Sequence, residues 1–168
     1  MRFAPAAIAL SLLAAVTSSV TFSEPVAEVR PEVAALLADG RAAVAEGAYD
    51  KAIDAYEAAL VLQPGNVPVL LNLAEATRFQ GMQGKALHYY REALESDPRN
   101  LAAIAGEGTA LAEKGALAKA ERNLARLKGM CGQDCDATRK LAAAIASGAA
   151  PRMVAAEMAT SEPTISEN

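Results

Sequence analysis

The feature that most constrains this chain is a pattern that returns every 34 residues. Residues 47–66, GAYDKAIDAYEAALVLQPGN, align without gaps with residues 81–100, GMQGKALHYYREALESDPRN. A weaker third copy follows at the same step and keeps Gly115, Ala120 and Leu124. A fixed period of this length is typical of arrays in which each unit buries its apolar face against the next. The residues shared by the first two copies are Gly47 with Gly81, Ala52 with Ala86, Tyr56 with Tyr90, Ala59 with Ala93, Leu60 with Leu94, Pro64 with Pro98, and Asn66 with Asn100.

The composition favours an all-α fold, and the repeat resembles the helix–turn–helix unit of the tetratricopeptide family, which implies two helices joined by a turn in each unit. The sequence is 52% hydrophobic but only 4% aromatic, and strand-like alternation is hard to find. The recurring glycines suit a left-handed end to the first helix, where a Cβ would be costly. The recurring prolines stop the second helix, and each recurring asparagine caps the helix that follows. The helices are expected at residues 32–46, 50–62, 67–80, 83–96, 101–113 and 117–128.

These positions resemble those of the tetratricopeptide repeat across roughly residues 33–134. The resemblance implies an α-solenoid of three helix–turn–helix repeats followed by a capping helix. Small residues are needed where the paired helices cross, and two rows of them recur at the 34-residue step. The rows are Gly40, Ala74 and Gly108, and Ala52, Ala86 and Ala120. The repeats are expected at about 33–66, 67–100 and 101–134, with an amphipathic cap helix at 137–147 whose N-cap is Asp136.

The N-terminus is predicted to be a secretory signal peptide, residues 1–23. One positive charge, Arg2, precedes an apolar run of roughly 14 residues, which is short for a membrane span of about 20 residues. Small and hydroxylated residues follow, as cleavage requires. The alternative is an uncleaved membrane anchor, the only case in which we expect a membrane to be a partner. The remaining segments are predicted as a linker at 24–31, the repeat domain at 32–148 and a disordered tail at 149–168.

Export implies a periplasmic or secreted bacterial protein in an oxidising compartment. Removal of the signal leaves 15 basic against 20 acidic residues, a net charge of −5, and no basic patch. Nucleic acid is therefore not an expected partner, because neutralisation of phosphates dominates such binding.

Catalytic chemistry is not indicated. The single histidine, His88, is expected on a helix surface, and the paired carboxylates at Glu92/Glu95 and Asp134/Asp136 are explained by helix surfaces and caps. A metal site needs three or four convergent ligands, which two cysteines without a nearby histidine do not supply. We predict a protein that is not an enzyme, with no cofactor, no metal and no small-molecule substrate.

The resemblance implies that the first helices of the repeats line a concave, partner-binding groove. Phe79, beside Arg78 and near Asn72, would form an aromatic, cationic and amide patch suited to a protein segment. The alternative is that Phe79 only packs between adjacent repeats. The predicted groove residues are Leu37, Arg41, Leu71, Asn72, Glu75, Arg78, Phe79, Thr109 and Glu113, with Val44, Ala105 and Ala112 at related positions.

One ligand class is disfavoured within this family. Chaperone-binding members hold a terminal carboxylate with a clamp of Asn, Lys and Arg side chains, and of the five clamp positions only Asn72 matches. The other four positions hold Leu37, Arg41, Ala102 and Gly106.

The only two cysteines, Cys131 and Cys135, bracket the turn between the third repeat and the cap helix. A disulfide across this turn is the favoured interpretation, because Cα atoms there can come within about 4.4–6.8 Å. Free thiols, or a redox or metal role, are the alternatives. Thioredoxin-type activity fits poorly, since three residues separate the pair and no sheet is expected.

The primary hypothesis is a non-catalytic scaffold or adaptor that binds a protein segment in the concave groove, centred on the second repeat. The alternative is a structural subunit or assembly factor of a cell-envelope complex whose groove binds nothing. In that alternative, an uncleaved N-terminal helix could serve as its membrane anchor. By analogy, similar periplasmic members of the family assist assembly of envelope machinery.

Overall fold

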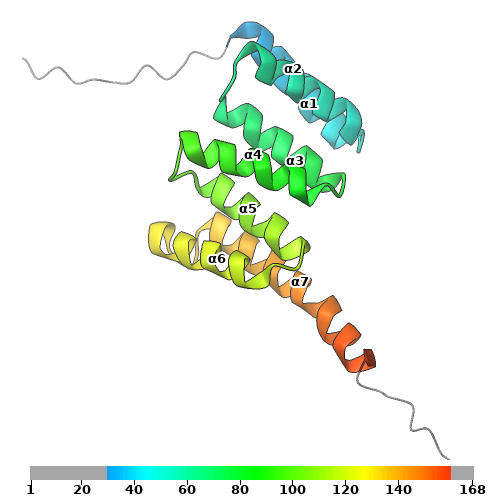
Figure 1. Ribbon diagram of the computed structural model, residues 1–168. Coiled ribbons are helices and arrows are strands. Elements are labelled where there is room, and N and C mark those ends of the chain that lie inside the picture. Colours follow the sequence, from blue (N-terminus) through cyan, green and yellow to red (C-terminus); the bar gives the residue numbers. More distant parts are fainter. Residues whose placement is uncertain (1–29, 160–168) are drawn as a thin grey trace, which may run out of the picture.

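A computed structural model describes residues 30–159, which form seven α-helices and no strand (Figure 1). Six of the helices lie within three residues of the predicted bounds. The predicted signal peptide at 1–23 and most of the predicted linker lie outside the described residues. The helices are α1 (Pro31–Ala45), α2 (Tyr49–Leu62), α3 (Val67–Phe79), α4 (Gln83–Ser96), α5 (Leu101–Glu113), α6 (Leu117–Cys131) and α7 (Asp136–Ala159).

The helices stack as antiparallel pairs into a solenoid. Helix α1 packs on α2, α3 on α4 and α5 on α6, and each pair packs on the next. Helix α7 then covers α5 and α6 at the end of the stack, as Figure 1 shows. This arrangement confirms the predicted all-α solenoid of three repeats with a capping helix. Within residues 30–159, no helix is long and apolar enough to cross a membrane.

The first helix of every repeat ends in the same way. Gly47, Gly81 and Gly115 have φ of +73°, +84° and +80°, in the left-handed region. In the middle repeat, the N–H of Gly81 donates to the carbonyl of Arg78 and that of Met82 donates to Thr77, at 2.9 Å each. This paired closure is the Schellman motif, and it confirms the predicted glycine caps.

The predicted asparagine caps are also present. The side chain of Asn66 accepts a hydrogen bond from the N–H of Val69 at 3.1 Å, and that of Asn100 accepts one from Ala103 at 2.9 Å. Each cap satisfies an N–H group that has no partner inside its helix. Helices α3 and α5 therefore begin at equivalent positions, 34 residues apart.

The small residues that recur where the paired helices cross make room for the side chains of neighbouring helices more than for their backbones. Ala52, Ala86 and Ala120 are fully buried. A Cβ on Gly40, however, would overlap the ring of Tyr56, so this glycine accommodates a tyrosine. On Gly108 a Cβ would lie 2.6 Å from a methyl group of Leu141 on α7. The third repeat thus uses its small position to seat the capping helix.

The cap helix differs from the prediction at both ends. Asp136 is the first residue of α7 and not its N-cap, since the carbonyl of Cys135 accepts the first bond, from the N–H of Arg139 at 3.0 Å. Helix α7 also continues past the predicted end at residue 147, through Pro151, to Ala159. The predicted disordered tail is therefore helical over residues 149–159. Ala, Met, Arg and Glu, all strong helix formers, flank the proline in this stretch.

Candidate functional site

A groove of about 610 Å³ lies between α3, α5 and α7. Its floor is made mostly of small apolar side chains from α5 and α7, together with Leu71 and Leu101. The ring of Tyr90 lies against Gly106, where a Cβ would overlap it. The groove is lined by Leu71, Glu75, Arg78, Tyr90, Leu101, Ala102, Ala105, Gly106, Thr109, Cys135, Asp136, Ala137, Lys140 and Ala144.

Arg78 is the central polar residue of the α3 side, and its charge is already engaged. Its Nη1 donates to Oε1 of Glu113 on α5 at 2.5 Å, and its Nη2 lies 3.9 Å from Oε1 of Glu75. Its Cζ lies 4.5 Å from the centre of the Phe79 ring, a cation–π arrangement. Burial alone would lower the pKa of Arg78, but Glu113 raises it, and the net shift is upward. Arg78 therefore remains charged and joins two repeats.

Tyr90 is the buried polar residue beneath the groove. The residue is 4% exposed, and burial raises the pKa of its hydroxyl to about 12, against a smaller opposite effect of Arg78. Tyr90 is therefore a neutral phenol at physiological pH and serves as part of the floor.

The α7 side of the groove carries a compact ion-pair cluster. Nζ of Lys140 lies 2.8 Å from Asp136, and Nη2 of Arg139 lies 3.5 Å from it. The hydrogen bond from Lys140 lowers the pKa of Asp136 and raises the pKa of Lys140. All three side chains are more than 60% exposed, so this cluster stays accessible from solvent.

The structure brings four of the predicted groove residues together in the groove and one to its edge. Glu113 reaches it through its bond to Arg78. Asn72 is half-buried, and its amide donates to the carbonyl of Pro68 in its own helix at 2.7 Å. Whether these residues contact a partner stays a prediction. The four are Leu71, Glu75, Arg78 and Thr109.

The first repeat does not contribute to the groove. Leu37 is only 5% exposed and belongs to the same core cluster as Tyr56 and Leu73, because its face of α1 packs on the neighbouring helices. The expectation that Leu37 faces a ligand is therefore corrected. Arg41 is exposed on α1 but does not line the groove.

Phe79 also lies outside the groove. Its ring stacks on Tyr49 of α2, with centroids 5.6 Å apart and an interplanar angle of 24°. Of the two alternatives for Phe79, packing between adjacent repeats matches this geometry, although the residue remains 44% exposed.

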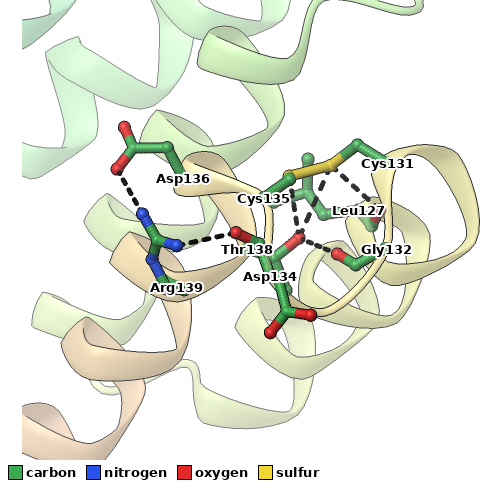
Figure 2. The surroundings of a disulfide bond; sticks show 8 residues. All are labelled: Leu127, Cys131, Gly132, Asp134, Cys135, Asp136, Thr138 and Arg139. Carbon is green, nitrogen blue, oxygen red and sulfur yellow. Dashed lines mark hydrogen bonds and ion pairs between the residues drawn. A yellow bond between two sulfur atoms is a disulfide. The ribbon is translucent and has the colours of Figure 1, made fainter.

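The cysteine pair forms the predicted disulfide, shown in Figure 2, and Cys135 also lines the groove. The Cα atoms of Cys131 and Cys135 are 5.9 Å apart. Buried Thr138 donates from its hydroxyl to the carbonyl of Gly132 at 2.9 Å, and its oxygen lies 3.2 Å from Sγ of Cys135. Gly132, with φ of +88°, makes the turn possible. The bond therefore closes the turn that sets α7 against α5. In the described range, no three His, Cys, Asp or Glu residues gather as a metal site.

The sequence-based prediction missed the α7 wall of the groove. One signal could have located it: continuing the 34-residue step from Ala102 and Gly106 leads to Asp136 and Lys140. The start of α7 thus occupies the place of a fourth first helix. The missed wall residues are Cys135, Asp136, Ala137, Lys140 and Ala144.

Comparisons with known proteins agree with this geometry. The family model described as "Tetratricopeptide repeat" matches residues 67–100, the middle repeat. The middle repeat thus matches the tetratricopeptide repeat, and the chain has the fold of a solenoid of such repeats. A similar solved structure, the Sgt2 repeat domain from Aspergillus fumigatus, has 26% identity and a TM-score of 0.62, covering 83% of this chain and 89% of that one.

Two further similar proteins are informative. The type III secretion chaperone SycD of Yersinia enterocolitica, solved in complex with a peptide of the translocator YopD, shares the repeat fold with a TM-score of 0.62 and 18% identity, covering 71% of this chain and 94% of that one. The photosystem I assembly protein Ycf3 of Cyanophora paradoxa is 36% identical over 107 residues, which are 58% of this chain. The match spans 62% of that relative's length.

Proposed function

We propose that this protein is a non-catalytic adaptor that holds a segment of a partner protein in the groove between α3, α5 and α7. The observation that carries the proposal is the groove itself. It has a volume of about 610 Å³, an apolar floor, and charged side chains on two sides. Apolar floors with a few fixed polar groups are typical of binding sites. The structure of SycD with a translocator peptide supports a peptide as the kind of ligand that this repeat fold accepts.

The segment is expected to be internal to its protein and not a chain terminus. Three features argue against a carboxylate clamp. The amide of Asn72 is used within its own helix, and the next repeat supplies Ala102 and Gly106, which carry no charge. A terminal carboxylate would therefore be desolvated without adequate compensation.

We further propose that the protein acts in an oxidising compartment, the bacterial periplasm or the cell exterior. The disulfide supports this location, since such bonds persist mainly outside the reducing cytosol. The short apolar N-terminal run supports export. N-terminal sequencing of the protein from fractionated cells tests the idea. We expect a start near residue 24 in the periplasmic fraction, and an intact Met1 in the cytosol would contradict it.

The groove is tested by a variant that fills it. Ala102 is exposed on α5 and lines the groove, so Ala102→Leu adds bulk there without entering the core. A photoreactive amino acid at position 102 first identifies the partner segment in envelope extract. Purified Ala102→Leu protein should then bind that segment at least about tenfold more weakly, by steric exclusion.

The matched control is Ala125→Leu, the same change at an exposed site on α6 that does not line the groove. It should bind as the wild type does. Equal binding by both variants would refute groove binding while leaving the fold intact, which circular dichroism verifies.

A second candidate function is assembly of a multisubunit complex. The similarity to the Cyanophora assembly protein, 36% over 107 residues, favours it. The two functions differ in their dependence on the groove. A structural or assembly role on an outer face predicts that Ala102→Leu leaves complex formation unchanged, whereas the adaptor predicts its loss.

A further inference from the structure

The charges around the groove are not equally available to a ligand. Arg78 gives its closest contact to Glu113, at 2.5 Å, and its side chain is only 15% exposed. The ring of Phe79 covers it from another side. The guanidinium is thus positioned by the protein and has little surface left for an incoming carboxylate.

The other groove-lining cation of the described chain, Lys140, is also paired. Its Nζ lies 2.8 Å from Asp136, a residue of the same helix and of the same groove. The charges of Lys140 and Asp136 therefore offset each other at the α7 wall, with Arg139 as a further cation at 3.5 Å from that carboxylate.

Glu75 differs from both. Its nearest ion-pair contact is Nη2 of Arg78 at 3.9 Å, which is too long for a hydrogen bond. That arginine is already bonded to Glu113, and the Glu75 side chain is 55% exposed. Two carboxylates thus share one arginine on the α3–α5 side, which leaves an excess negative charge beside an apolar floor.

The floor itself admits close approach. Ala102, Ala105 and Gly106 on α5 face Ala137 and Ala144 on α7, and none of them carries a side chain beyond Cβ. A ligand's larger apolar side chains have room to enter between the helices. Contact with the floor would position the neighbouring residues of the ligand along the α3 edge, where Glu75 stands.

We propose that the groove selects a basic–apolar segment: larger apolar side chains on the small-residue floor and a Lys or Arg that pairs with Glu75. This inference rests on the proposed adaptor function and names its ligand class. Charge complementarity carries it, because both groove cations have carboxylate partners at hydrogen-bonding distance while Glu75 has none. Acidic segments would meet Glu75 and Glu113 and be repelled.

Three blocked peptides of twelve residues test the proposal directly. They share an Ala/Leu framework and differ only in carrying three Lys, three Gln or three Glu residues; blocked ends remove terminal charges. Fluorescence anisotropy should give an order of affinity of Lys over Gln over Glu. A partly exposed ion pair is worth up to about fivefold in affinity, so Glu75→Gln should remove about that much from the Lys peptide alone.

Glu95→Gln is the matched control, since Glu95 is exposed on α4 and does not line the groove. It should leave all three affinities unchanged. Added salt should reduce the preference for the Lys peptide by screening.

Ala102→Leu separates the two possible failures. In the first case, Ala102→Leu weakens binding of both the Lys and the Glu peptide, but the two peptides bind wild type equally or Glu75→Gln changes no affinity. The groove then binds peptides, and the charge preference is overturned. If Ala102→Leu changes no affinity, or no peptide binds, the groove is not a peptide site and the adaptor function falls with the inference.

Discussion

Gly108 and Leu141 meet at the point where the capping helix joins the array. A Cβ on Gly108 would lie 2.6 Å from a methyl carbon of Leu141, and Leu141 is fully buried. Leu141 therefore uses the space that the absent side chain leaves on α5. This contact is part of the packing that joins α7, and with it one wall of the groove, to the third repeat.

Shortening that side chain should loosen the cap. We expect Leu141→Ala to lower the free energy of unfolding by about 2–4 kcal/mol, from lost burial and an unfilled cavity. Hydrogen exchange should rise first in α7 and α6. Arg139→Ala, at an exposed site on the same helix, should change stability by less than about 0.5 kcal/mol. Equal losses in the two variants would contradict the role given to Leu141.

Gly81 and Gly84 should respond in opposite directions to the same substitution. Gly81 has φ of +84°, so Gly81→Ala should cost about 1–2 kcal/mol from backbone strain alone, since open space surrounds its Cβ. Gly84 lies within α4 and also has open space, so Gly84→Ala should stabilise by about 0.5–1 kcal/mol. Urea unfolding of both variants measures the difference. A loss at both sites would contradict the conformational explanation.

The disulfide should contribute modestly to stability. It closes a short loop, for which the chain-entropy relation gives about 2 kcal/mol. Dithiothreitol should therefore lower the unfolding midpoint of the wild type. The reductant should not change the unfolding midpoint of the Cys131→Ser/Cys135→Ser double variant. That midpoint should equal the midpoint of the reduced wild type. Any effect of the reductant on the double variant would point to a cause other than this bond.

Alkaline pH should weaken the fold through Tyr90. Burial raises the pKa of its hydroxyl to about 12 in the folded protein, against about 10 in the unfolded chain. Between these values the unfolded state has released a proton that the native state retains, so stability falls as pH rises from 10 towards 12. The free energy of unfolding should be about 1 kcal/mol lower at pH 11 than at pH 9 on this account.

Tyr90→Phe is the test of that assignment. The variant cannot ionise at position 90, so its stability should fall less over the same pH interval than that of the wild type, measured by urea unfolding at each pH. An unchanged pH dependence would mean that other groups cause the loss.

Much of the fold could be predicted because the signals that end and start its helices are local. Glycine in the left-handed region and asparagine at the N-cap act within a few residues, so their 34-residue recurrence marks the helix ends. The end of α7 has no such signal. There Gly148 and Pro151 resemble a stop, yet the helix continues to Ala159.

The groove was harder to predict, because it depends on how successive helices face one another. Position within the repeat predicted Glu75 and Arg78 as groove residues, and both line the groove, while their contact with a partner stays a prediction. It could not show that Leu37 is buried by the helices around it, or that Phe79 stacks on Tyr49. Nor could it supply the α7 wall, since α7 lacks the repeat's own sequence features.

The matching caps at Asn66 and Asn100 make residues 67–100 an interchangeable module. A duplicate of this segment, inserted after Asn100, would begin behind an asparagine cap and end at another. Array length could therefore be changed by genetic duplication in steps of one unit. Such a lengthened solenoid would carry a second copy of the Glu75 and Arg78 edge, and so a longer track for a partner chain.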